Sequence, residues 1–287
     1  MTSVASTIYA RLITDVRPFR PVALQLLRMV GDPSVPFGKV GDLIQTDPVL
    51  STDLLRIANS PLFPSRVEVS SVLRAIVFLG SDMVSALVLT TCLKSLVAPR
   101  ANRFILASWR HSLATALVCQ HLSDAMSMPG ANGYTAGLIH DIGQMALLNA
   151  FPAYAKALAL VQEGGLNPMD VERKLFGLDH CEAGSWLLAQ WGCPVELQRV
   201  AAEHENPAQP QERSGGLIRL VHGASAMADL MGMSLLESPG CVDLSQIAAA
   251  LPEASRELTV ERFGELTETV ITKINGIELS LTSRLTD

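Results

Sequence analysis

The sequence predicts an all-α protein, a multi-helix bundle of about a dozen helices by the mean helix length of soluble proteins. Apolar residues recur at intervals of three and four almost throughout the 287 residues. No run alternates strictly between polar and apolar residues, and the β-branched residues do not group into short segments between turn residues, as strands require. Hydrophobic residues make up 48% of the chain and charged residues 17%, which supplies enough apolar surface for a large core.

The N-terminal part predicts short amphipathic helices in succession. Residues 21–30 place four apolar side chains on one helix face: Val22, Leu26, Leu27 and Val30. Residues 42–60 contain two helices that Asp47-Pro48 separates, with Asp47 as the N-cap and Pro48 at the first helical position.

The most apolar stretch, residues 72–93, is long enough to be compared with a membrane span. Arg74, Asp82 and several hydroxyl side chains interrupt it, and Gly80-Ser81 predicts a helix break with an N-cap. We therefore expect two buried helices and no membrane segment. The N-terminus lacks a basic segment followed by an apolar one, so we expect no signal peptide and a cytoplasmic protein.

A seam at residues 97–104, where a proline and two arginines interrupt the apolar pattern, predicts two subdomains, 1–98 and 99–287. All six histidines follow the seam, which implies that the two parts have different tasks. Residues 204–216 are polar and rich in Pro and Gly and predict a loop, and helical spacing resumes in the tail through Leu258, Phe263, Leu266, Val270 and Ile271.

Composition argues against two classes of site. The net charge is −6, Lys and Arg are scattered and aromatic residues make up 5%, so we expect no binding to nucleic acid. An odd number of cysteines without a Cys-x-x-Cys motif argues against a disulfide framework and a thiolate zinc site. We expect small core residues in a reducing compartment at Cys92, Cys119, Cys181, Cys193 and Cys241.

The strongest chemical signal is the doublet His140-Asp141, inside the apolar helical stretch 136–148. Two ionisable neighbours in a buried helix need partners. The doublet either ligates a metal or forms a buried hydrogen-bonded pair, and both alternatives stay open here. Gly137 and Gly143 would let another helix approach closely at this level.

Other histidines predict a His/Asp-rich site spread over several helices. His111 is expected near a helix start, His180 at the start of a helix that Asp179 caps, and His204 near a helix end. Neutral imidazole and carboxylate suit a divalent ion such as zinc, iron or manganese. His121 and His222 are expected to be hydrogen-bonded core residues.

The motifs, in their order, resemble the HDOD domain, a bacterial signalling module related to HD-type metal phosphohydrolases. The resemblance extends from about Pro18 to the C-terminal helix. The resemblance rests on these motifs: Asp47-Pro48, Ala58-Asn59-Ser60, Ala75-Ile76, Leu79-Gly80, the segment Trp-Arg-His-Ser at 109–112, the segment Gly-Leu-Ile-His-Asp-Ile-Gly at 137–143, and residues 180–194.

The resemblance implies a helical N-terminal half and an HD-like C-terminal half. It also implies metal ligands at His111, His140, Asp141 and a later aspartate, but Ser225 occupies that last position. Asp229, one turn further on, would substitute only if the helix slides. A second departure is Glu205, where related two-metal enzymes tend to have another histidine.

A site that lacks its anchoring carboxylate is expected to bind metal weakly. We therefore expect a non-catalytic regulatory module that acts through signalling proteins or a small ligand, with a homodimer as a plausible state. The alternative is a metal-dependent phosphohydrolase acting on a nucleotide or cyclic dinucleotide, with His140 and Asp141 as its candidate catalytic residues. A weaker alternative is a pocket that binds a nucleotide without cleaving it.

Overall fold

The computed structural model describes residues 3–15, 20–30, 32, 34–60, 63, 67–97, 103–123, 128–207, 215–236, 243–251, 256 and 261–282. These residues form helices joined by short connections, and no strand occurs among them, which confirms the predicted all-α class. Parts of the predicted seam and loop, residues 98–102 and 208–214, lie outside the described residues, as do Cys241 and Leu258.

Contacts divide the chain into two compact units. One unit combines Met1–Pro18 with Leu96–Phe263, and the other combines Phe19–Ser95 with Gly264–Asp287. The predicted division into 1–98 and 99–287 assumes two continuous segments. In the structure each unit combines two segments: the first unit includes the N-terminal segment, and the second includes the C-terminal segment. The first helix, α1 (Ser3–Asp15), joins the first unit because it packs on α9 and α12, where Tyr9 and Trp186 have ring centroids 4.4 Å apart.

The second unit contains five consecutive helices and most of α17 (Phe263–Thr282). The five are α2 (Pro21–Met29), α3 (Phe37–Gln45), α4 (Pro48–Ala58), α5 (Val72–Leu79) and α6 (Ser81–Lys94). The predicted face of α2 is buried at Val22, Leu26 and Leu27, and Val30 is half-buried. Along α17, Leu266 and Val270 are buried as the tail pattern predicts, and Phe263 and Ile271 are half-buried.

Asp47 is the N-cap of α4, as predicted. Its Oδ1 accepts hydrogen bonds from the backbone N–H groups of Val49 at 3.0 Å and Leu50 at 3.1 Å. Pro48 is the first residue of the helix. Arg20 adds an ion pair at 2.5 Å to the other oxygen. Partial burial alone would raise the pKa of Asp47, but Arg20 and the two backbone donors lower it below its usual value.

Replacing this cap, Asp47→Ala, should lower the free energy of unfolding by about 1 kcal/mol, because two N–H groups of α4 lose their acceptor. The cap stabilises the charged carboxylate, so its contribution is complete above pH about 4 and is lost as the pH falls through the lowered folded pKa. Urea unfolding at neutral and acidic pH measures both effects. A variant whose deficit stays constant with falling pH contradicts the electrostatic part.

A bend separates α5 from α6, as predicted. Gly80 adopts φ +85°, and the cap is Gly80 itself, so Ser81 is the first residue of α6 rather than its N-cap. No single helix in the described ranges is long and apolar enough to cross a membrane. The pair α5 and α6 reaches that length only together, and the two are bent by 119°. Most of α6 is buried, but α5 exposes 62% of Leu73 and 81% of Val77, so the expectation of two buried helices holds only for α6.

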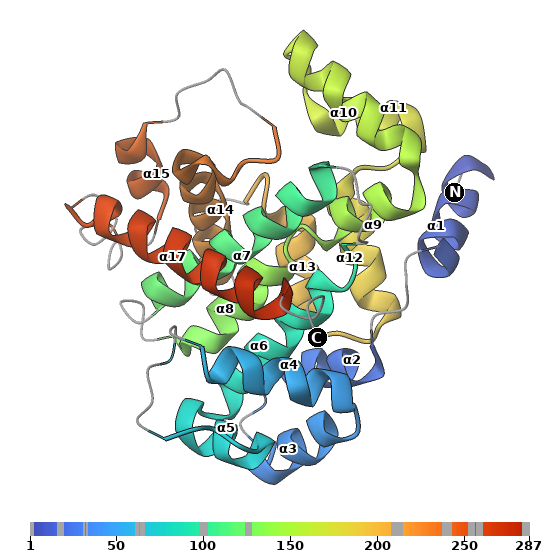
Figure 1. Cartoon of the computed structure of the whole chain (residues 1–287). Coiled ribbons are helices and arrows are strands. Elements are labelled where there is room, and N and C mark those ends of the chain that lie inside the picture. The colour runs from blue at the N-terminus through green and yellow to red at the C-terminus, as the bar shows by residue number, and fades with distance from the viewer. Residues whose placement is uncertain are drawn as a thin grey trace. The chain divides into compact units, whose positions relative to one another are not determined.

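The first unit carries the histidines. After α1 it contains α7 (Arg103–Ser123), α8 (Gly130–Ile139), α9 (Ile142–Ala150), α10 (Pro152–Gly164), α11 (Pro168–Phe176), α12 (His180–Gln190), α13 (Val195–Glu203), α14 (Gly215–Ala228), the π-helical turn η2 (Asp229–Met233) and α15 (Leu244–Ala250). Within this unit α7 packs on α8, α9 and α14, and α12 packs on α9 and α13 (Figure 1).

Two glycines allow the close approaches that the sequence predicts. A Cβ on Gly137 would lie 2.8 Å from the Cα of Ala116 in α7, and a Cβ on Gly143 would lie 2.0 Å from the carbonyl oxygen of His180 in α12. These contacts bring α7 and α12 to the doublet, which lies between the two glycines. The four cysteines within the described ranges are buried free thiols, as expected.

Candidate metal centre

The doublet lies at a break between two helices, which corrects the prediction of one continuous helix. Helix α8 ends at Ile139 and α9 begins at Ile142, with Asp141 in the N-cap position of α9. The Asp141 side chain makes no capping hydrogen bond to α9 and instead joins the surrounding histidines. Both residues are buried, His140 at 1% exposure and Asp141 at 8%.

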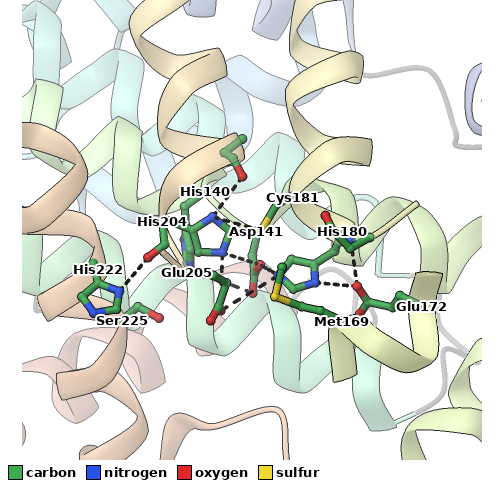
Figure 2. A network of polar contacts seen from close by, with 12 residues as sticks. His140, Asp141, Met169, Glu172, His180, Cys181, His204, Glu205, His222 and Ser225 are labelled. Carbon is green, nitrogen blue, oxygen red and sulfur yellow. Dashed lines mark hydrogen bonds and ion pairs between the residues drawn. The ribbon is translucent and has the colours of Figure 1, made fainter. Parts of the chain in front are cut away.

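Three histidines present Nε2 to the carboxylate of Asp141 (Figure 2). His140 Nε2 lies 3.9 Å from Oδ2, while the Nε2 atoms of His180 and His204 lie 3.7 and 3.4 Å from Oδ1. The separation of His140 from Asp141 is too long for a hydrogen bond, so the alternative of a hydrogen-bonded doublet is wrong. Asp141 is therefore placed between His140 on one oxygen and His180 and His204 on the other.

The Nδ1 atom of each of these histidines has a partner on the side away from Asp141. In His140 it lies 2.7 Å from the carbonyl oxygen of Gly137, and in His204 it lies 3.1 Å from that of Ala201. A carbonyl oxygen only accepts, so Nδ1 carries the proton and donates. When the ring is neutral, this tautomer leaves the Nε2 lone pair directed at Asp141.

Glu172, on α11, holds the third ring. Its Oε2 lies 2.8 Å from both the backbone nitrogen and Nδ1 of His180, and Tyr154 donates its hydroxyl to Oε1. Glu172 is fully buried, and this carboxylate has three donors. Nothing in the local sequence marks Glu172, because it precedes His180 by eight residues and belongs to another helix.

Replacing Glu172→Gln should lower the free energy of unfolding by about 1–3 kcal/mol, because a buried amide cannot accept all three hydrogen bonds. Thermal unfolding of the purified chain measures the change. Glu163→Gln, on the exposed surface of α10, is the matched control and should change stability by less than about 0.5 kcal/mol. Equal effects of the two substitutions would contradict the structural role of Glu172.

The cluster strongly perturbs its own ionisation. Burial lowers the pKa of His140 to about 3, which keeps this ring neutral. Burial alone would raise the pKa of Asp141, but His140, His204 and His180 hold it well below its usual range. Burial alone would lower the pKa of His204, but Asp141 and Cys181 raise it to about 10. Burial alone would lower the pKa of His180, but Cys181, Glu172 and Asp141 together raise it well above its usual value.

His111 lies on the other side of His140, with ring centroids 5.4 Å apart. It sits in the middle of α7 rather than near its start, because the helix begins at Arg103. Its Nε2 lies 3.1 Å from the hydroxyl of Ser225, and its Nδ1 lies 3.3 Å from Asp229 and 3.2 Å from the carbonyl oxygen of Met233. Asp229 therefore contacts the nitrogen opposite the one that faces Ser225.

Glu205 and Cys181 border the cluster near His180 and His204. Glu205 Oε1 lies 3.7 Å from His204 Nε2 and 4.0 Å from His180 Nε2, and its side chain is 47% exposed. The thiol of Cys181 lies 4.0 Å from Nδ1 of His204, on the side away from Asp141. His222 contacts the carbonyl oxygen of His204 through Nδ1 at 2.7 Å, so it is hydrogen-bonded as predicted, but it is half-buried rather than a core residue. His121 lies ten residues after His111, about 15 Å along α7.

These residues fit a divalent cation. His140 Nε2, Asp141 Oδ1 and His204 Nε2 are buried and have no hydrogen-bond partner among the described residues. Buried polar atoms normally have a partner, and an imidazole and carboxylate set suits zinc, iron or manganese. Two groups of potential ligand atoms lie within 4.8 Å of one another: His111, His140 and Asp141 form one, and His180, Cys181 and His204 form the other.

Comparison with known proteins agrees with the fold and the motifs. The sequence profile of the HDOD domain matches residues 17–207. An uncharacterised protein of Treponema pallidum is 25% identical over 222 residues, which span 74% of this chain and 42% of that protein, so the chain covers less than half of its relative.

Solved structures share the fold at low identity. An HDOD domain protein of unknown function from Geobacter sulfurreducens has a TM-score of 0.78 at 21% identity, covering 96% of this chain and 97% of the other. A candidate phosphohydrolase from Shewanella amazonensis has a TM-score of 0.70 at 23% identity, covering 99% of each chain. A candidate signal transduction protein from Marinobacter aquaeolei has a TM-score of 0.74 at 20% identity, covering 97% of this chain and 62% of the other.

Proposed function

The chain belongs to the HDOD domain family, and we propose that it is a non-catalytic signal-transduction module with a degenerate HD site. The proposal places it in the bacterial cytoplasm, acting through signalling proteins or a small ligand such as a nucleotide. The exposed Leu73 and Val77, one turn apart on α5, support a protein partner, because apolar side chains exposed in succession favour association.

The proposal rests on which side chains lie next to the two ring nitrogens of His111. An HD-type ligand set around His111, His140 and Asp141 needs a closing carboxylate, and the residue at hydrogen-bond distance from His111 Nε2 is Ser225. A neutral hydroxyl is a much weaker ligand than a carboxylate for a hard cation. Asp229 does not replace the missing carboxylate, because its side chain contacts Nδ1 of His111 and not Nε2.

The second candidate is a metal-dependent phosphohydrolase. Asp141 favours it, since its buried Oδ1 accepts no hydrogen bond from the described residues and faces two histidines. A cation held by such residues would supply Lewis-acid polarisation of a phosphate and a more acidic water. His140 and Asp141 would bind that cation, and Glu172 would keep the His180 ring in place.

Metal analysis of chain purified without chelators, followed by turnover of a generic phosphodiester with added manganese, separates the two candidates. The non-catalytic proposal expects turnover no faster than that of the Asp141→Asn variant. Turnover that manganese stimulates and Asp141→Asn abolishes would overturn it in favour of the phosphohydrolase. Circular dichroism of the variant verifies that it folds.

A further inference from the structure

We propose that α1 is exchanged between two copies of the chain, so that the α1-binding surface of one copy holds α1 of the other. This surface consists of Ala150 and Phe151 at the end of α9, Trp186 in α12, and the part of α11 that packs on α1 (Figure 1). The inference goes beyond the proposed function, because it identifies a partner, a second copy of this chain, and the surface that binds it.

The α1-binding surface recognises an apolar ridge and an aromatic ring. Ile8 and Leu12 lie one turn apart on the same face of α1 and are 7% and 0% exposed. Tyr9 packs against Trp186 of α12, with ring centroids 4.4 Å apart. An amphipathic helix that binds here therefore needs two apolar residues at this spacing and an aromatic residue beside them.

Arg11 adds a contact that depends on the end of α9. It donates to the carbonyl oxygen of Ala150, the last residue of α9, at 2.6 Å, and its guanidinium carbon lies 4.4 Å from the centroid of the Phe151 ring. The last carbonyl groups of a helix have no partner within the helix and carry partial negative charge, so they favour a cation. The aromatic ring favours it as well. A basic residue between the two apolar ones is thus part of what the surface selects.

The place of α1 in the chain permits exchange. The helices on which α1 mainly packs all belong to the first unit, whereas the next helix, α2, belongs to the second unit. The residues that match the HDOD domain begin at 17, so α1 lies before the matched domain. Because the chain continues from α1 into the other unit, the surface can be filled by α1 from either copy through the same contacts.

The contacts of α1 are few, so we expect it to detach more often than the first unit unfolds. A helix of 13 residues is marginal on its own in water. Among the α1 side chains that the structure describes, Ile8 and Leu12 are the buried ones. Elements with few buried contacts open at a lower free-energy cost than the core. When α1 of a second copy replaces the first, every lost contact is made again, so a rising protein concentration favours the exchanged form.

A second copy is the occupant that the contacts favour. Its α1 carries the complete set of recognised side chains, namely Ile8, Tyr9, Arg11 and Leu12, at the required spacing. Exchange in both directions closes a symmetric dimer in which each α1-binding surface is filled. A helix of another protein would have to reproduce all four side chains.

The test mixes two variants of the whole chain that are defective in opposite halves of the contact. Leu12→Ser removes the apolar ridge from α1 and leaves the α1-binding surface intact. Trp186→Glu damages the surface at a half-buried position and leaves α1 intact. In the mixture, α1 of the second variant can bind the surface of the first. Native mass spectrometry and light scattering should show a complex of the two variants, at least about tenfold tighter than the self-association of either one.

Ile13→Ser is the matched control for Leu12→Ser. Ile13 is the next residue of α1, but it is 56% exposed, so this chain keeps its own α1 in place. Mixed with Trp186→Glu, it should form at least about tenfold less complex, because its surface is already filled. Circular dichroism and thermal unfolding verify that all three variants fold.

Three outcomes would overturn the inference. One is a mixture of Leu12→Ser and Trp186→Glu that gives no complex. Another is an equal amount of complex with Ile13→Ser, which would place the association on a different surface. The third is a wild-type chain without any dimer at about 1 mM, where a second α1 competes with the chain's own. Phosphodiester turnover and metal content bear on the proposed function alone, so the two proposals fail independently.

Discussion

A single methyl group at position 143 should severely destabilise the first unit. In Gly143→Ala the new Cβ would lie 2.0 Å from the His180 carbonyl oxygen and 2.5 Å from the Gly184 nitrogen, both of them backbone atoms that cannot rotate away. Helix α12 would have to move, and with it His180. We expect a loss of about 3 kcal/mol or more in the free energy of unfolding, beyond the usual range for overpacking. Differential scanning calorimetry should show a melting temperature lower by roughly 6–12 °C.

Gly38→Ala is the control for this substitution. Gly38 lies in α3, and a Cβ there meets no atom within 4 Å, so alanine should be neutral or slightly stabilising. A Gly143→Ala chain as stable as the wild type would show that α12 does not rest against α9 at this contact.

Replacing Ser225→Asp should restore the ligand set of the HD side. The introduced carboxylate would stand beside Nε2 of His111, where the hydroxyl now lies at 3.1 Å, and would close a set with His140 and Asp141. We expect the variant to bind one more equivalent of divalent cation than the wild type, with affinity in that position raised by at least about tenfold. Equilibrium dialysis with manganese gives the stoichiometry.

Ala226→Asp controls for the added negative charge, since the neighbouring residue on α14 points about 100° away from Ser225. A stoichiometry unchanged in Ser225→Asp, or raised equally in both variants, would contradict the account of the degenerate site. Phosphodiester turnover that appears only in Ser225→Asp would show that one lost carboxylate separates this module from an enzyme.

Much of the fold follows from local sequence. Asp47-Pro48 starts α4 and Gly80 ends α5, because caps and turns depend on a few neighbouring residues. The roles of Gly137 and Gly143 were also predictable, since two glycines around a buried polar pair indicate close helix packing. The break at His140-Asp141 was not, because the apolar residues on both sides continue the helical spacing.

The candidate site was predictable in its residues but not in its geometry. His111, His140, Asp141, His180 and His204 do gather in the structure, yet the spacing alone could not show which ring nitrogen faces which carboxylate. Glu172 has no signal in the local sequence because its partners, Tyr154 and His180, lie on two other helices. The absence of a Cys-x-x-Cys motif predicts a core residue at Cys181, and the structure shows that this buried thiol also touches the cluster.

The membership of α1 in the first unit has a consequence for biosynthesis. Arg11 donates to the carbonyl oxygen of Ala150, 139 residues later, and the apolar side chains Ile8 and Leu12 are buried. At translation rates of about 5–20 residues per second, this helix waits roughly 7–30 s on the ribosome before that partner is made. During that interval Ile8 and Leu12 lack the surface that buries them in the folded chain, and a fragment starting at the second unit would leave the matching face of α9 uncovered.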